Sequence, residues 1–386
     1  MVWILGALSL ANDSASDMIY PLIPLYLSAV LMAGPRALGL IEGVAEASSS
    51  VLKLAAGVLA DRSRRMRGWI GSGYVVSGLA RPLIGLSTSW LGVLGCRLAD
   101  RAGKGLRSAP RDALLSLSVT PEQRGLAFGL HRAMDDAGAV IGPLVAAALL
   151  AWGLSLRAIF LWSVVPAVAV IVLASRIPEP AIRVPVIRAG FDWRVGQLPP
   201  AFRRYLVTLG LFTLGNSSNM FLLLRAEQIG ASAERVVLMW VLYSAVAMLL
   251  STPLSALSDR LGRIRVLGSA WAAYAVAYLV IGLLPQADWA LWLAFVLYGT
   301  VTAALEGTEK ALVADLVEGE RSGTAYGWYN LVAGLMLLPA SLIFGALWQS
   351  VSAAVAFGFG ALCAVGATVL LTRWVASPSS PASMGA

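Results

Sequence analysis

Ionisable side chains interrupt the apolar stretches in the first half of this 386-residue chain. They are Asp13, Asp17, Glu42, Glu46, Lys53, Arg81, Arg97, Asp100, Arg101, Lys104, Asp112, His131, Arg132, Asp135 and Asp136. A charge at the centre of a bilayer costs roughly 2.5 kcal/mol or more unless it is paired or hydrated. So many charges within a few apolar stretches therefore predict a water-filled cavity where carboxylates bind protons and cations bind anionic groups.

The acids are candidates for carrying a proton. Asp13, Asp135 and Asp136 are the first choices because all three fall near the middle of their apolar stretches, and Asp17 and Glu46 follow. A proton-coupled protein needs an acid that binds a proton in one state and releases it in another, which a change in burial or in a neighbouring cation can produce.

The cations are candidates for binding an anionic group or for keeping those acids ionised. Measured from Ser89 along a helix, Arg97 lies roughly 12 Å deep and Arg101 roughly 18 Å deep, and Arg132 is the third candidate. Opposite charges four residues apart also predict neutralising pairs on one helix face, Asp100 with Lys104 and Arg132 with Asp136. Some of these groups are expected to do no more than satisfy one another.

The second half has few charges within its spans, mainly Glu306, Glu309 and Lys310, and many aromatic and amide side chains. Asn216, Tyr298 and Asn330 are its candidate contacts for a solute. A cavity with one charged wall and one aromatic, hydrogen-bonding wall suits an amphiphilic or partly charged organic solute better than a bare inorganic ion.

The sequence offers little for covalent or metal chemistry. Its two cysteines, Cys96 and Cys363, lie in apolar stretches, and His131 is its single histidine. Gly103-Lys104-Gly105 lacks the spacing of a phosphate-binding loop, and no Ser/His/Asp arrangement is readable. We therefore expect a protein that is not an enzyme and that holds no cofactor or metal.

Composition defines the elements that must position these residues. The chain is 58% hydrophobic and 13% charged, with a mean hydropathy of +0.77, against about 25% charge in a soluble domain. With about 20 residues needed per span, the apolar runs predict twelve transmembrane helices in an all-α integral membrane protein. They lie near residues 4–31, 37–60, 68–86, 89–112, 124–152, 156–176, 204–228, 234–257, 266–284, 289–311, 323–348 and 351–374.

The net charge of +8 follows from topology. Most lysines and arginines outside the spans fall on alternate loops, which the positive-inside rule assigns to the cytoplasm. Both termini are predicted to be cytoplasmic, in a multi-pass protein of the cell (inner) membrane that contacts anionic lipids. Because the cations are dispersed over separate loops, no nucleic-acid partner is expected.

The two halves of the chain repeat one another. Asp61-Arg62 recurs as Asp259-Arg260, and Gly125 and Gly129 recur as Gly323 and Gly327, each 198 residues later. A constant offset predicts a parallel duplication of a six-helix unit. The expected organisation is a bundle at 1–176, a Pro/Arg-rich cytoplasmic linker at 177–203, a bundle at 204–375 and a disordered tail at 376–386.

Two loops resemble a signature of the major facilitator superfamily, Gly-x-x-x-Asp-Arg-x-Gly-Arg. They are carried by Gly57, Asp61 and Arg62 in the first copy and by Asp259, Arg260, Gly262 and Arg263 in the second. Arg64 replaces the usual second Gly of the first copy, and Ser255 replaces the first Gly of the second copy. The resemblance implies a gate that closes the cytoplasmic side, in which an acid docks on a neighbouring helix end.

A third stretch resembles the antiporter motif of the same superfamily. Its residues are Gly129, Gly138, Gly142 and Pro143, with Ala146-Ala147 where Gly-Gly is usual. Small residues and a proline predict that this span bends and packs closely on its counterpart in the other half. In the superfamily the motif accompanies exporters that exchange a substrate for protons.

The resemblance extends over the chain through Arg373. Together the motifs identify the chain as similar to the drug:H⁺ antiporters of the superfamily. The resemblance implies two six-helix bundles that alternate access to a midplane site, proton-gradient-driven efflux of a small molecule, and a monomer. It leaves two alternatives open: import of an anionic nutrient or metal chelate, and a channel or lipid flippase with the same fold.

Overall fold

The computed structural model describes residues 1–63, 66–119, 124–177, 195–283, 288–317 and 322–375, and its regular elements there are all helical. The first half contains the following elements: α1 (Val2–Ile19), α2 (Leu22–Leu25), the π-helical turn η1 (Tyr26–Val30), α3 (Pro35–Ser63), α4 (Met66–Leu83), the 3₁₀ turn η2 (Ile84–Leu86), α5 (Trp90–Leu117), α6 (Arg124–Ala151), α7 (Leu156–Trp162) and α8 (Val164–Ser175).

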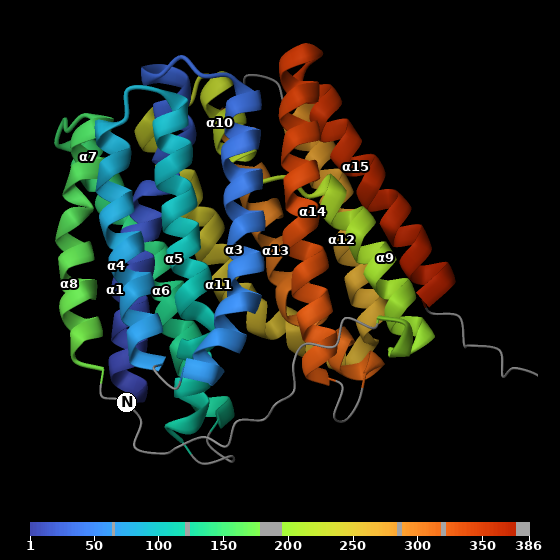
Figure 1. Ribbon diagram of the computed structural model, residues 1–386. Coiled ribbons are helices and arrows are strands. Elements are labelled where there is room, and N and C mark those ends of the chain that lie inside the picture. Colours follow the sequence, from blue (N-terminus) through green and yellow to red (C-terminus); the bar gives the residue numbers. More distant parts are fainter. Residues whose placement is uncertain (64–65, 120–123, 178–194, 284–287, 318–321, 376–386) are drawn as a thin grey trace, which may run out of the picture.

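The second half contains α9 (Pro200–Gly215), α10 (Met220–Gln228), α11 (Ala233–Leu261), α12 (Arg263–Leu283), α13 (Asp288–Leu316), α14 (Ser322–Ser350) and α15 (Ala353–Leu370), followed by the π-helical turn η6 (Leu371–Val375). The helices of the first half stand together on one side of the molecule, and α9, α12, α14 and α15 stand on the other (Figure 1). The linker was predicted to extend to residue 203, but α9 already begins at Pro200, where proline suits the first helical turn. Residues 178–194 of that linker and the tail at 376–386 lie outside the described residues.

Eight helical segments of the described chain are long and apolar enough to cross a membrane. They include α6, α7 with α8, and every long helix of the second half. Helices α1, α3, α4 and α5 fall outside this set, and they are the helices that carry Asp13, Glu46, Arg81 and Arg97. Charged side chains therefore lower the mean hydropathy of the helices on which the sequence analysis places the candidate site.

The first helix of each half is interrupted at matching positions. The α1 segment ends at Ile19, ahead of Pro21, and α9 ends at Gly215, with Asn216 outside the helical region at φ −91° and ψ 80°. The two interruptions differ by close to the 198-residue offset of the sequence repeat. At the first interruption Tyr20 and Pro21 keep helical φ and ψ angles, so the chain bends there without unwinding. At the second, the non-helical backbone of Asn216 is tolerated at membrane depth only inside protein or along a cavity, so this break marks the interior of the molecule.

Glycines on α6 bring it against α1 within the same half. A Cβ at Gly138 would lie 2.7 Å from the Leu10 carbonyl oxygen, and one at Gly142 would lie 2.7 Å from the Met18 amide nitrogen. The expectation that these motif glycines pack on the other half is therefore wrong. The α6 helix does touch the other half through α11, but these two glycines serve the α1 contact.

The halves meet mainly at the end of the bundle opposite Met1. There Ser28 Oγ lies 2.6 and 2.7 Å from the two carboxylate oxygens of Glu227, and the Arg36 amide donates to Gln349 Oε1 at 3.3 Å. Further down, a Cβ at Gly43 would lie 3.1 Å from the Leu338 carbonyl oxygen, so α3 and α14 pack almost backbone to backbone.

Candidate functional site

A closed network of ion pairs joins α3, α4 and α5. One carboxylate oxygen of Asp100 accepts a hydrogen bond from Arg81 Nε at 2.9 Å, and the other accepts one from Arg97 Nη1 at 3.2 Å. Arg97 also donates to Glu42 Oε1 from Nη2 at 2.6 Å and from Nε at 2.9 Å. All four side chains are at most 2% exposed, so each charge is neutralised inside the protein.

The sequence brings these helices close enough for the network through small residues. A Cβ at Gly103 of α5 would lie 3.0 Å from the Ser77 amide nitrogen of α4, and Ser77 Oγ donates to the Asp100 carbonyl oxygen at 2.9 Å. Asp100 thus pairs across helices with Arg81 and Arg97. The expected Asp100–Lys104 pair does not form in the part of the chain that the structure describes.

The network reaches the other half at the break between α9 and α10. Ser218 Oγ donates to Glu42 Oε2 at 3.2 Å. Beside it, Tyr20 at the end of α1 lies on Trp240 of α11, with ring centroids 5.0 Å apart, and Arg97 lies 5.8 Å from the Tyr20 ring centroid. The two helix interruptions therefore meet at one junction between the halves.

A second set of charges comes from α5 and from the neighbouring helices α1 and α3. Arg101 Nε lies 2.8 Å from Glu46 Oε1. Lys104 is exposed although the flanking Gly103 and Gly105 are buried, and its charged neighbours include Arg101, Glu46 and Asp13. Asp17, partly exposed, has Asp13, Lys104 and Arg101 as charged neighbours. Arg101 itself is buried, whereas Glu46, Asp17 and Lys104 keep part of their surface exposed.

Two of the remaining predicted acids, Asp13 and Asp135, lie where α1 meets α6. Asp13 accepts a hydrogen bond from Asn12 Nδ2 at 2.8 Å and packs against Gly138, one turn beyond Asp135. Asp135 Oδ2 lies 3.5 Å from His131 Nδ1. The predicted Arg132–Asp136 pair is confirmed, with Arg132 Nε 3.0 Å from Asp136 Oδ1.

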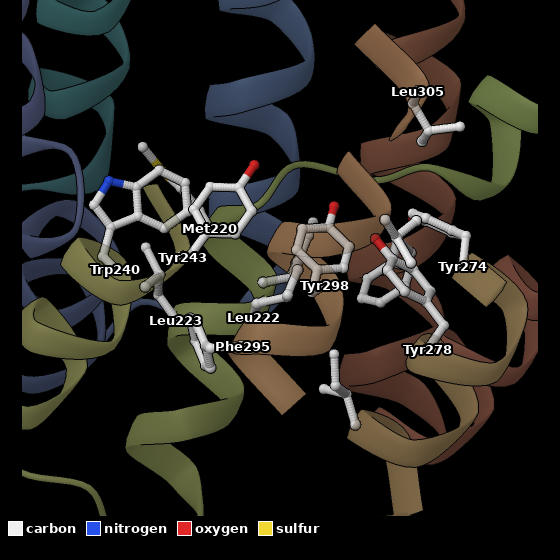
Figure 2. Packing of buried hydrophobic residues seen from close by; sticks show 14 of the residues in the cluster. Met220, Leu222, Leu223, Trp240, Tyr243, Tyr274, Tyr278, Phe295, Tyr298 and Leu305 are labelled. Carbon is white, nitrogen blue, oxygen red and sulfur yellow. The ribbon is translucent and has the colours of Figure 1, made fainter. Parts of the chain in front are cut away.

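Stacked tyrosines fill the wall of the second half. The Tyr298 ring lies 5.6 Å from Tyr243 and 6.1 Å from Tyr278, and Figure 2 shows these rings in a row with Trp240 and Tyr274. Tyr298 donates to Asn219 Oδ1 at 2.7 Å. All of the ring side chains in this row are buried, so they form a packed core of the second half rather than an open surface.

The two predicted asparagines have different surroundings. Asn216 Oδ1 accepts from the Tyr274 hydroxyl at 3.1 Å, and Asn216 lines a cavity between α9, α13 and α14. Asn330 is exposed, and its Nδ2 donates at 2.8 Å to the Tyr326 carbonyl of its own helix.

The second gating motif ends α11 and contacts α13. Gly262 closes the helix at φ +91°, a conformation that favours glycine. Arg263 pairs with Asp259 and also reaches Asp315 Oδ2 in the last turn of α13, with Nε 3.3 Å away, while Arg260 is exposed. The acid of this motif was expected to contact the neighbouring helix, but the described contact to α13 is made by Arg263.

The side chains of the first gating copy and of one antiporter-motif residue lie outside the described part of the structure. Gly57, Asp61 and Arg62 belong to the backbone of α3, and Gly129 belongs to α6, but their side-chain surroundings lie outside the described part of the chain. Pro143 is inside α6.

A cavity of about 530 Å³ separates the halves at the end where Met1 lies. Its walls come from α6, α11 and α13, and it is lined by Arg132, Ser251, Thr252, Ser255, Ala256, Asp259, Arg263, Gly307, Lys310 and Ala311. With the contacts at the opposite end, this cavity gives an arrangement that is closed at one end and hollow at the other.

The sequence model of the Major Facilitator Superfamily matches residues 2–224 and, a second time, residues 205–385. The chain belongs to the Major Facilitator Superfamily. An uncharacterized MFS-type transporter of Methanocaldococcus jannaschii is 32% identical over 380 residues, which cover 96% of this chain and 94% of that protein. The multidrug resistance protein MdtH of Photorhabdus laumondii is 26% identical over 337 residues, which cover 86% and 82%.

Solved structures show the same fold. The nucleoside transporter NupG superposes with a TM-score of 0.78 at 13% identity, covering 96% of this chain and 97% of that one. A D-xylose-proton symporter superposes with a TM-score of 0.72 at 15% identity, covering 96% of each chain. Membership of the superfamily makes this chain a multi-pass membrane transporter and not an enzyme.

Four residues of this transporter's interior were not selected as site residues from sequence. Glu42, Arg81 and Glu309 were recognised only as charges within spans, and Ser218 was not singled out. The signal available for the first three was their position inside an apolar run. Ser218 carries no signal of its own, because its importance comes from the break between α9 and α10.

Proposed function

We propose that this chain is a proton-coupled secondary transporter that works by alternating access and exports a small amphiphilic or partly charged organic solute. In this proposal it crosses the inner membrane twelve times as a monomer, with both termini in the cytoplasm. The MdtH relatives, named as multidrug resistance proteins, favour export of an organic solute.

The observation that carries proton coupling is the contrast between two kinds of acid. Glu42 and Asp100 are held by arginines in a buried network. Asp13 and Asp135 instead lie on the α1–α6 contact beside Asn12 and His131, and the guanidinium of Arg111, which pairs with Asp112, acts on them from further away. An acid bonded directly to a guanidinium stays ionised, whereas an acid without that bond can gain and lose a proton as its surroundings change.

A second candidate function is import of an anionic nutrient or metal chelate. It is favoured by two exposed cationic side chains, Lys104 on α5 and Lys53 on α3. Flux measured in right-side-out and inverted vesicles distinguishes the two directions.

The test uses proteoliposomes with an imposed pH gradient and a labelled solute chosen by thermal-shift screening, since a bound ligand raises apparent stability. Asp13→Asn, Asp135→Asn and Asp136→Asn are compared with wild type. We expect the variant of the coupling acid to lose gradient-driven flux while solute exchange without a gradient persists.

Asp112→Asn is the matched control, because Asp112 is half exposed and pairs with its neighbour Arg111. Full gradient-driven transport by all three of the Asp13, Asp135 and Asp136 variants contradicts the coupling assignment.

A further inference from the structure

Ser28 and Glu227 join the two halves at the closed end, the end of the bundle opposite Met1. Ser28 belongs to η1 of the first half, and Glu227 belongs to the last turn of α10 in the second half. Ser28 Oγ lies 2.6 Å from Glu227 Oε2, 2.7 Å from Glu227 Oε1 and 3.2 Å from the Leu25 carbonyl oxygen. Three oxygen atoms thus surround one hydroxyl group.

The number of protons at this contact determines which of these distances can be hydrogen bonds. A serine hydroxyl has one proton to donate, an ionised carboxylate has none, and a protonated carboxyl group has one. If Glu227 is ionised, the single Ser28 proton must serve three acceptors. If Glu227 is protonated, its hydroxyl donates to Ser28 Oγ and Ser28 donates in return to the other carboxyl oxygen. Each of the two short contacts then has its own proton.

The immediate surroundings of Glu227 provide no cation for its ionised form. Glu227 is partly exposed, and Ser28 is the side chain that acts on it among the described residues. The nearest arginine on its own helix, Arg225, is directed to α12, where it donates to the carbonyl oxygens of Ile281 and Gly282 at 3.4 and 3.2 Å. Closing this end therefore takes the carboxyl group partly out of water with a single neutral partner, which favours its protonated form.

The elements that pack against α10 and Ser28 bring no charged partner either. Helix α2 has no ionisable side chain, and the Tyr26 hydroxyl of η1 donates to a backbone carbonyl. At this end of the bundle α3 begins with the exposed Arg36, and α11 begins with the exposed Glu234 and Arg235. None of these side chains acts on Glu227.

We propose that Glu227 is a proton-binding site that is filled when this end of the transporter is closed and emptied when it opens. On opening, the O–H bond of the carboxyl group breaks, the proton passes to water, and the electron pair stays on the carboxylate; closing reverses the step. The inference rests on the proposed alternating-access function and adds a proton site separate from Asp13 and Asp135.

This site biases the cycle but carries no net proton flux. The proton returns to the side from which it came, so transport persists without the site while its response to pH changes. Acid on the side that the closed end faces fills the site and favours closure. In the proposed exporter that side is the outside, so a low outside pH favours return of the empty transporter to the state that faces the cytoplasm.

The experiment measures the width of the closed end in purified full-length protein in detergent, by double electron–electron resonance. Spin labels are attached at Trp152→Cys and Val351→Cys in a Cys96→Ala, Cys363→Ala background. Both labelled positions are exposed, and they follow α6 and α14, one helix from each half. One linked proton changes an equilibrium by up to about tenfold per pH unit, so the open-to-closed ratio should rise at least about tenfold from about pH 5 to about pH 8.

Two variants at the contact and one control make the result decisive. Glu227→Gln keeps a donor and an acceptor but cannot ionise, so at the alkaline end of the range its open-to-closed ratio should be at least about tenfold below that of wild type. At the acidic end it should match wild type. Ser28→Ala removes the partner and should raise the ratio at the acidic end about fivefold, the scale of one hydrogen bond. Glu234→Gln removes an exposed carboxylate at the start of α11 and should follow wild type throughout.

The opposite arrangement, in which ionised Glu227 holds the end closed, predicts that Glu227→Gln opens it at alkaline pH. That result overturns the inference, and so does a Glu227→Gln protein whose ratio follows wild type at every pH. If Glu227→Gln does not stay monodisperse, Ser28→Ala decides, and a ratio equal to wild type at acidic pH overturns the inference.

Failure of this site and failure of the proposed function are distinguishable. Gradient-driven transport by wild type, with no altered pH response in Glu227→Gln, refutes the Glu227 site and leaves the transport function standing. The expected pH response in a protein that shows no gradient-driven transport supports the Glu227 site and refutes the transport function.

Discussion

The buried Glu42–Arg97–Asp100–Arg81 network shows how charged residues can be structural in a membrane protein. Each guanidinium and carboxylate loses its hydration on burial, and only mutual pairing and further hydrogen bonds offset that cost. Arg81 completes its set by donating from Nη1 to the Asn12 carbonyl oxygen at 3.0 Å. The network thus fixes the rotation of α3, α4 and α5 relative to α1.

Asp100→Asn removes the shared acid of two buried arginines. Because it leaves guanidinium charge uncompensated, we expect it to lower the free energy of unfolding by about 3–5 kcal/mol. Thermal and denaturant unfolding in detergent measure the change. Asp112→Asn, at a half-exposed pair, should cost less than about 1 kcal/mol. Equal losses in the two variants would contradict a structural role for the network.

At the scale of the elements, the interrupted helices and the small residues decide which helices can approach. The breaks after Ile19 and Gly215 place Tyr20 and Ser218 at the junction of the halves. Gly138 and Gly142 bring α6 onto α1, which sets the predicted acids Asp13 and Asp135 into one contact region.

Gly142→Ala tests the α1–α6 contact. The added methyl would meet the Ser14 carbonyl oxygen and lie 2.7 Å from the Met18 amide nitrogen, both backbone atoms that cannot rotate away. We expect a loss of about 1–3 kcal/mol in unfolding free energy, together with reduced transport. Gly95→Ala is the matched control, because nothing lies within 4 Å of its added Cβ in α5. It should be neutral or stabilising by up to about 1 kcal/mol, and a similar loss in both variants would show that the contact is not tight.

For the whole molecule, contacts close one end and a cavity of about 530 Å³ opens the other. At the closed end Ser28 of η1 meets Glu227 of α10, and α3 packs on α14. In the proposed alternating-access cycle these contacts break when the opposite end closes.

A cross-link across the closed end tests that cycle. In a Cys96→Ala, Cys363→Ala background, Ser28→Cys and Glu227→Cys joined by a short bis-maleimide should hold the halves together and abolish transport. Each single-cysteine variant treated with the same reagent should keep most of its flux. Undiminished transport by the fully cross-linked protein would contradict rocking of the halves about this junction.

Hydropathy, charge and spacing along the chain were enough to predict the all-helical architecture, the approximate extent of the helical spans, the repeat of the two halves and the concentration of charge in the first half. These properties are readable because the bilayer demands long apolar helices, and a duplication leaves motifs at a constant offset. Tertiary structure decided the partners. Glu42 and Arg97 are 55 residues apart in the chain, Asp100 bonds across helices instead of to Lys104, and Gly142 packs on α1. Each of these contacts depends on how separate helices rotate and cross, which hydropathy and spacing along one helix do not encode.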